Sequence, residues 1–227
     1  ILSKYVRDYG FGSETGIELP GEGAGILYNP EDMSKLDVAT MSIGQGIAVT
    51  PLQMVRAFGA LSNGGAMMRP HIIKSYSNAQ GEVTSTTENT VVGQPVPEET
   101  AKTIVDILEK EVSEGGGNKA MVEGYHFGGK TGTAENAHGR DHGWFVAYAP
   151  YDKPQIVVVA LVEQGSFGAG SAGPIVRDIL AAYFNVPVNK KSNDTNSKGN
   201  KETAAGTSSN NGQKPQNAVT SGQPRKD

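Results

Sequence analysis

Apolar residues recur at helical spacing in four stretches of the chain. The clearest stretch is 97–114, where Pro97 and two acidic residues open the segment and a run of glycines follows it. Acidic residues favour the start of a helix because the positive end of the helix dipole lies there. The stripe of this helix comprises Ala101, Ile104, Ile107 or Leu108, and Val112. The same spacing predicts the end of a helix at 1–9 and a helix at 51–62 with Thr50 as its N-cap.

The last helix is predicted to start at Pro174. Its apolar positions recur at helical spacing and are Ile175, Ile179, Leu180 and Tyr183.

Strand patterns lie between the helices. A hairpin is predicted at 70–87, with β-favouring residues on either side of a turn at 78–81. Three further strands are predicted around 125–134, at 144–150 and at 155–164. Strands in succession, with helices before and after them, predict an α+β fold in which helices flank a mainly antiparallel sheet.

The composition changes at about residue 189. The segment 189–227 has no aromatic residue and is dominated by Asn, Ser, Thr, Gly, Lys and Gln. Such a segment cannot bury enough apolar surface to offset the entropy of ordering, so a disordered tail is predicted. The domain prediction is therefore a folded part at 1–188 and a polar tail at 189–227. The tail has a net charge of +4, so the part before it has −8.

Composition excludes several kinds of site. The net charge of −4 argues against a nucleic-acid partner, and the absence of cysteine excludes disulfides and a thiol nucleophile. The longest aliphatic run, 156–162, is far shorter than the roughly 20 residues that span a bilayer. The chain starts at Ile1 within a helical pattern, so we expect it to be a fragment of a longer protein.

The stretch GYHFGGKTGTAEN, residues 124–136, matches two unrelated catalytic patterns. One is G-x-x-x-x-G-K-T, the phosphate-binding loop of nucleotide hydrolases. That loop requires a buried strand before it and a helix after it, because the N-terminal amides of the helix bind the phosphates. The segment before Gly124 is too polar for a central strand, and the residues after Thr131 would not sustain a helix.

The second pattern is K-T-G, which occurs in serine enzymes that act on penicillin-like ligands. On an extended strand, Lys130 and Gly132 would face one way and Thr131 and Thr133 the other. Gly132 would leave a bare strand edge at which a substrate backbone could pair. An ammonium group and two hydroxyls nearby would suit the carboxylate at the end of a peptide. The tripeptide alone is also compatible with an ordinary polar turn.

Beyond the tripeptide, the chain resembles the class B penicillin-binding proteins, which cross-link peptidoglycan. It is similar to the C-terminal part of their transpeptidase domain, and most similar to the elongation-type branch. The matching segments are TGIELPGE (15–22), MSIGQGIAVTPLQMVRAFGALSNGG (41–65), RPH (69–71), GKTGTAE (129–135), HGWFVAYAP (142–150) and GPIVRDIL (173–180). Together they span nearly all of residues 1–188.

The resemblance implies the fold shared by penicillin-binding transpeptidases and serine β-lactamases, with a five-stranded sheet, here incomplete at its N-terminus. It implies serine acyl transfer on the D-Ala-D-Ala end of a peptidoglycan stem peptide, without a cofactor or metal. β-Lactam antibiotics are implied as ligands, and a membrane glycosyltransferase of the cell-wall machinery as a partner. The implied location is the extracytoplasmic face of the bacterial cytoplasmic membrane, with an anchor upstream of Ile1.

The resemblance also implies roles for residues. Lys130 would supply positive field and hydrogen bonds, and the backbone N–H of Thr133 would be an oxyanion-hole donor. Thr131 and Thr133 would bind the substrate carboxylate, and Gly132 would allow close approach. Trp144 is a candidate substrate contact, with sheet packing as the alternative.

Two motifs that the family needs are missing from the sequence. No serine has a lysine three positions later, so there is no S-x-x-K, and S-x-N occurs only in the tail, at Ser208 and Ser209. Both motifs precede K-T-G in the family, so we expect the nucleophile to lie upstream of Ile1 and this fragment alone to be inactive. Two alternatives remain: a non-catalytic module that senses β-lactams or binds peptidoglycan, and a serine β-lactamase.

Other candidate residues are expected to be structural. Ser42 has Gln45 where a base lysine would be needed, and Ser166 and Ser171 lie in a glycine-rich loop without a nucleophile elbow. His138, Asp141 and His142 are expected in a solvated loop that borders the groove rather than at a metal, because Gly139 argues against a helix that would align the histidines.

Overall fold

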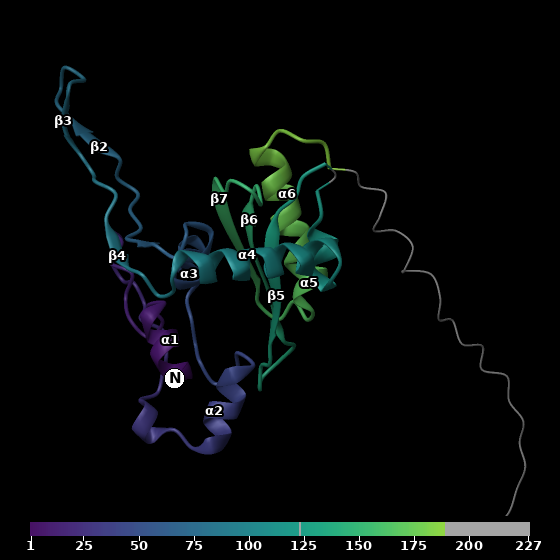
Figure 1. Ribbon diagram of the computed structural model, residues 1–227. Helices are drawn as coiled ribbons and strands as arrows, with labels where there is room; N and C mark the ends of the chain where they lie inside the picture. The colour runs from purple at the N-terminus through teal and green to yellow at the C-terminus, as the bar shows by residue number, and fades with distance from the viewer. Residues whose placement is uncertain (123, 189–227) are drawn as a thin grey trace, which may run out of the picture. The chain divides into compact units, whose positions relative to one another are not determined.

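A three-stranded antiparallel sheet forms the centre of the protein in a computed structural model, which describes residues 1–122 and 124–188 (Figure 1). The strands are β5 (Gly128–Ala134), β6 (His142–Ala149) and β7 (Ile156–Val162), in that spatial order. All three predicted strands are confirmed, with ends a few residues from those expected. The sheet has three strands in the described residues, whereas the resemblance implies five. The predicted tail lies outside these residues, so the domain boundary stays a prediction.

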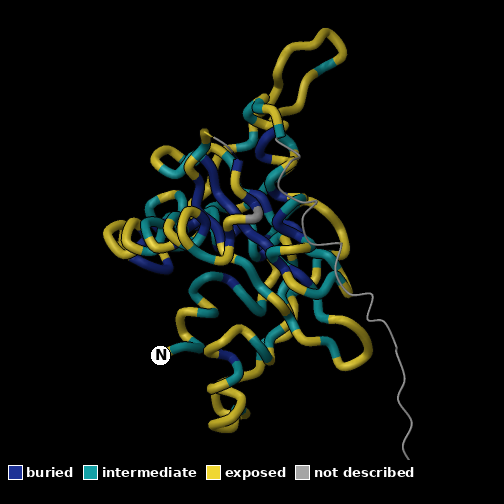
Figure 2. The backbone as a smooth tube through the Cα atoms, turned by 90° about the vertical axis from the view of Figure 1, so that its right-hand side faces the viewer, coloured by how far each residue is buried: buried dark blue, intermediate teal, exposed yellow. Residues whose placement is uncertain are grey.

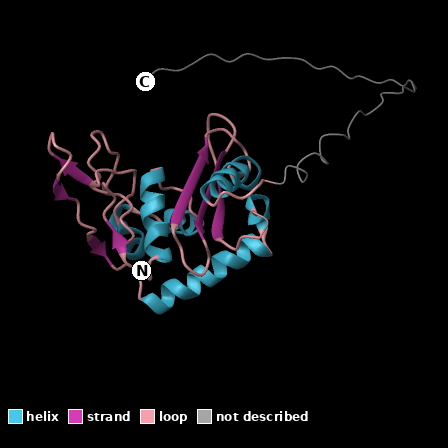
Figure 3. Ribbon diagram, turned by 90° about the horizontal axis from the view of Figure 1, so that it is seen from above, coloured by secondary structure: helices cyan, strands magenta, loops and turns pink. Residues whose placement is uncertain are grey.

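Helices cover both faces of the sheet (Figure 3). Alternate residues of β6 point to opposite faces because strand side chains alternate. Tyr148 faces α4 (Glu98–Ser113), where its hydroxyl donates to the carbonyl of Val105 at 2.7 Å. Phe145 faces the other way and packs against α6 (Gly173–Tyr183) in the main hydrophobic core. The fold is therefore α+β, with helices flanking an antiparallel sheet, as predicted.

The buried face of α6 is not the row of its larger apolar residues. Its buried residues are Gly173, Val176, Leu180 and Ala181. Of the four apolar positions noted in the sequence only Leu180 is buried, whereas Ile175, Ile179 and Tyr183 are 43%, 41% and 53% exposed. A Cβ atom on Gly173 would lie 3.6 Å from the Phe145 ring, so the small residue at 173 lets this face of the helix pack closely against the sheet. In α4 the stripe runs through Leu108, while Ile107 is exposed.

The N-terminal part of the chain contains three helices, α1 (Leu2–Asp8), α2 (Lys35–Ser42) and α3 (Pro51–Ser62), and a 3₁₀ turn at Pro30–Asp32. Helix α3 begins as predicted, with Thr50 as N-cap in a reciprocal capping box with Gln53. Gln53 is fully buried, and its amide also donates to the carbonyls of Ser13 and Ala24 at 2.9 and 2.8 Å. This side chain therefore ties the loop before α2 to α3.

Two small hairpin-like sheets precede α4. Strands β2 (Ser75–Ser77) and β3 (Val83–Thr86) form the predicted hairpin, which projects from the rest of the described residues and is exposed along both strands (Figure 2). At its base, β1 (Met67–Met68) pairs with β4 (Val91–Gly93). None of the helices in residues 1–122 and 124–188 has the length and apolar character needed to cross a bilayer.

Candidate functional site

The K-T-G segment lies on β5, at the edge of the central sheet. Within the described residues β5 pairs only with β6, so its other edge has no neighbouring strand. Two glycines, Gly128 and Gly129, precede Lys130 and are buried, whereas the K-T-G residues are partly or fully exposed. A rigid, buried start and an accessible end suit a strand that positions a binding edge.

Position 128 has no room for a side chain, because Tyr148 occupies the space beside it. A Cβ atom on Gly128 would overlap the Tyr148 hydroxyl, and that ring is completely buried. Burial raises the pKa of the Tyr148 phenol, which therefore stays neutral and able to donate to Val105. The link between β6 and α4 thus fixes the start of β5.

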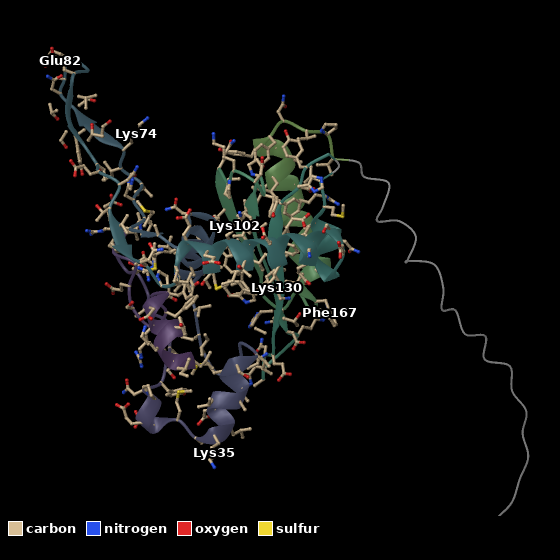
Figure 4. The ribbon with its side chains drawn as sticks, in the orientation of Figure 1. Lys35, Lys74, Glu82, Lys102, Lys130 and Phe167 are labelled. Atoms are coloured by element: carbon tan, nitrogen blue, oxygen red, sulfur yellow. The ribbon has the colours of Figure 1, made fainter. Side chains whose placement is uncertain are left out.

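The side chains of the segment alternate between the two faces of the sheet, as predicted. Lys130 lies on the α4 side of the sheet (Figure 4). Its Nζ is 3.4 Å from Oε1 of Glu111. Thr133 lies on the other side, where its Oγ1 accepts from the amide of Gly168 at 3.4 Å. The predicted ammonium and hydroxyl groups therefore do not converge on one face. A carboxylate that contacts both of them has to lie along the open edge of β5.

Gly132 stands directly opposite Trp144 of β6. A Cβ atom on Gly132 would lie 3.3 Å from Cβ of Trp144, so the indole occupies the same face as Lys130. Trp144 is half-buried. The structure thus places Trp144 beside the K-T-G strand, where sheet packing explains its position and substrate contact stays a prediction.

Two segments outside the K-T-G strand approach Thr133. Gln45 follows α2, and its Nε2 lies 3.5 Å from the Thr133 carbonyl. The short helix α5 (Gly168–Ser171) approaches from the other side, where a Cβ on Gly168 would come within 2.4 Å of the carbonyls of Gly132 and Trp144. The SIGQG segment was the only sequence signal at Gln45. Helix α2, which precedes it, has no apolar stripe, so the sequence did not predict that Gln45 packs near β5.

The remaining candidates have structural surroundings. The Ser42 hydroxyl donates to the Ala39 carbonyl within α2, consistent with a structural role. His142 is not in a loop as expected: it is the first residue of β6, and its Nδ1 accepts from the Gln164 amide at 3.0 Å. Ser171 likewise ends α5 rather than lying in a loop, because a short helix forms at Gly168. Among the described residues, no three His, Asp or Glu side chains come together as metal ligands would.

A separate hollow of about 740 Å³ lies between α3, α4 and the turn after β6. Its lining includes Glu98, Lys102, Asp106 and Tyr151, and none of the predicted site residues. The candidate site is therefore an exposed strand edge and not this cavity.

Comparison with known proteins connects this strand edge to one family. Residues 2–181 match the family model of the penicillin binding protein transpeptidase domain. Stage V sporulation protein D of Bacillus subtilis is 41% identical over 193 residues, which cover 79% of this chain and 29% of that protein. Peptidoglycan D,D-transpeptidase MrdA of Haemophilus influenzae is 30% identical, covering 84% of this chain and 35% of that protein.

Solved structures agree with these relatives. The D,D-transpeptidase domain of a peptidoglycan glycosyltransferase from Eggerthella lenta superposes with a TM-score of 0.72 at 29% identity, covering 80% of this chain and 46% of that one. Penicillin binding protein 3 of Mycobacterium tuberculosis in complex with aztreonam gives 0.71 at 30% identity, covering 81% and 46%. The chain spans about a third of the length of the curated relatives it matches.

Proposed function

Because this chain belongs to the penicillin-binding protein transpeptidase family, in its class B, we propose that it is the C-terminal part of a peptidoglycan D,D-transpeptidase domain. The relatives bear different names, a sporulation protein, MrdA and an FtsI homolog, so the elongation-type branch stays a prediction. The proposal rests mainly on the open edge of β5. The K-T-G residues lie on this strand, and no other strand of the described residues pairs with that edge.

The proposed reaction is acyl transfer in two steps. A serine hydroxyl attacks the carbonyl of the D-Ala-D-Ala bond, an acyl-enzyme ester forms, and D-Ala leaves with the proton that the serine gave up. The amine of a second stem peptide then attacks the ester, an amide forms, and the serine regains its proton. A β-lactam mimics the dipeptide and leaves the serine acylated.

This chain supplies the substrate-binding wall in the proposal. The substrate backbone pairs with the free edge of β5 as an added strand, and Gly132 allows its close approach. The backbone N–H of Thr133 stabilises the oxyanion, a contribution of roughly 3–4 kcal/mol for one such donor. Thr131 and Thr133 bind the substrate carboxylate, Lys130 supplies positive field beside it, and Trp144 contacts the substrate from β6.

The serine nucleophile and its base belong, in this proposal, to a segment upstream of Ile1, because the sequence has no S-x-x-K. The 227-residue chain alone is then inactive. The same upstream segment carries the membrane anchor, which places the domain outside the cytoplasmic membrane. A membrane glycosyltransferase is the proposed partner, since transpeptidation needs a supply of new glycan strands.

The intact mass of the chain after incubation with a labelled penicillin tests these points. We expect no covalent adduct on the 227 residues, and one adduct per molecule once an upstream segment with S-x-x-K and S-x-N is restored. An adduct on the 227-residue chain would place the nucleophile inside it. A restored protein that stays unlabelled would contradict the transpeptidase assignment.

A second candidate is a non-catalytic module that senses β-lactams or binds peptidoglycan, because the free edge of β5 could bind a ligand without a nucleophile. Reversible binding of penicillin by the restored protein, without an adduct, would identify this case. Steady release of hydrolysed drug would instead identify a β-lactamase.

A further inference from the structure

Glu111 on α4 is the acidic partner of the K-T-G lysine. Its Oε1 lies 3.4 Å from Nζ of Lys130, although a segment that includes the 3₁₀ helix Gly116–Ala120 separates α4 from β5 in the chain. The next acid on the helix, Glu109, faces His126 instead, at 3.5 Å. Within the described residues, Glu111 is thus the carboxylate that Lys130 meets on this face of β5.

The carboxylate of Glu111 is held more firmly than the ammonium group. A Cβ atom on Gly115 would lie 2.7 Å from Oε2 of Glu111, and one on Gly116 would lie 3.5 Å from Oε1. The turn after α4 therefore packs over the carboxylate, and the adjacent Val112 is buried in the core. The Lys130 side chain is 54% exposed, against 27% for Glu111. The lysine is the partner that can move.

The contact is also a loose one. A strong charge-assisted hydrogen bond between nitrogen and a carboxylate measures about 2.7–2.9 Å, and exposed ion pairs contribute little to stability. A substrate carboxylate that approaches the edge of β5 can therefore draw the ammonium away from Glu111, but it must do so against the negative charge of Glu111.

We propose that Glu111 is a specificity-determining residue, which weakens the binding of substrates that end in a carboxylate by competing for the Lys130 ammonium. This inference rests on the proposed function, in which Thr131 and Thr133 bind that carboxylate. One ammonium group shared between two carboxylates binds the second less tightly than an unpaired ammonium would. The effect is electrostatic and the Lys130 side chain is 54% exposed, so salt weakens it.

The test uses acetyl-D-alanyl-D-alanine and its C-terminal amide as probes of the full 227-residue chain. Trp144 is the only tryptophan of the sequence and lies opposite Gly132, so its fluorescence reports binding at the K-T-G strand. We expect E111Q to bind the acid two- to fivefold more tightly than the unmodified chain at low salt, and to bind the amide equally well. The difference should shrink in 0.5 M salt. The matched control is E114Q, which removes the same charge from an exposed position at the end of α4.

E111D, the second variant, keeps the negative charge. We expect its affinity for the acid to be closer to that of the unmodified chain than to that of E111Q. Equal affinity of E111Q and the unmodified chain for the acid would overturn the inference and leave the proposed function standing. Tighter binding of the amide as well would also overturn it, because the effect would then not depend on charge. If neither probe changes the fluorescence of any variant, the proposed substrate-binding role of β5 fails, and the inference fails with it.

Discussion

Gly132 on β5 and Trp144 on β6 are directly paired across the sheet, and a methyl group on Gly132 would come 3.3 Å from Cβ of Trp144. That distance is tight but not prohibitive, so the fold alone does not demand glycine at this position. The backbone of Gly132 does not adopt the left-handed conformation that favours glycine. A requirement at the edge of β5, such as the close approach of a second backbone, gives a reason for glycine here.

The first prediction tests whether ligand binding, rather than the fold, requires glycine at position 132. In the protein with its upstream segment restored, Gly132→Ala should lower the rate of acylation by labelled penicillin at least tenfold, because the methyl group keeps the ligand off the strand edge. The free energy of unfolding should change by no more than about 1 kcal/mol.

Gly59→Ala is the matched control for this variant. Gly59 lies inside α3, and a Cβ there would meet nothing within 4 Å. This change should stabilise the protein by about 0.5–1 kcal/mol, because alanine is the better helix former, and it should leave acylation unaltered. Equal acylation by both variants would show that Gly132 has no role in ligand approach.

A second prediction concerns the Tyr148 hydroxyl. Tyr148→Phe should destabilise the protein by about 1–2 kcal/mol at neutral pH, because the buried hydrogen bond to Val105 is lost. Burial raises the pKa of the folded-state phenol above its unfolded value of about 10, so its contribution is complete below pH 10 and is lost as the pH rises further. Urea unfolding at pH 8, 10 and 11 should therefore show a smaller alkaline loss for the variant.

The control for Tyr148 is Tyr76→Phe in the exposed hairpin. It should change neither the neutral stability nor the alkaline slope. If Tyr148→Phe and Tyr76→Phe behave alike, the hydroxyl bond between β6 and α4 does not contribute to stability.

A third prediction concerns the buried amide of Gln53. Gln53→Leu keeps much of the volume but leaves the Thr50 amide and the carbonyls of Ser13 and Ala24 without this partner, so we expect a loss of about 2–4 kcal/mol. Thr50→Ala removes only the other half of the capping box and should cost about 1 kcal/mol. Chemical denaturation of the two variants measures the difference. A loss no larger than that of Thr50→Ala would mean that Gln53 acts only as a helix cap.

Local signals in the sequence were sufficient for much of the fold. Thr50 and Pro51 define the start of α3, the Asn78 turn defines the hairpin, and alternation places K-T-G on a strand. Each of these features depends on residues within a few positions of one another.

Features that depend on distant residues were not predictable in this way. Helix α2 was not predicted, because it buries only Met41 and therefore has no apolar stripe. Its Ser34–Asp37 capping box was the one local sign of a helix start. The buried face of α6 includes the small residues Gly173 and Ala181 and leaves Ile175 and Ile179 exposed, so hydrophobic size did not predict it. The Glu111–Lys130 contact joins a helix to a strand across 19 positions, and no periodicity connects them.

A fourth prediction concerns acid. The Glu22 carboxylate accepts hydrogen bonds from the amides of Thr15 and Gly16 at 2.7 and 3.0 Å. Burial alone would raise the pKa of this carboxyl, but the hydrogen bonds from Thr15 and Gly16, together with the charge of Arg56, outweigh burial and lower it. Since the folded-state pKa lies below the unfolded value of about 4.3, the stabilisation is complete above that pH and is lost as the pH falls through the folded value.

Glu22→Gln should therefore be less stable than the unmodified chain at pH 7, because an amide offers only one accepting oxygen to the two backbone donors. Its stability should also fall less steeply between pH 5 and pH 3, since residue 22 no longer titrates. Urea unfolding at pH 7, 5, 4 and 3 measures both effects. Glu14→Gln, an exposed change in the same loop, is the control and should follow the unmodified curve. If the stability of Glu22→Gln and that of the unmodified chain fall in parallel across this range, titration of Glu22 does not contribute to the loss of stability in acid.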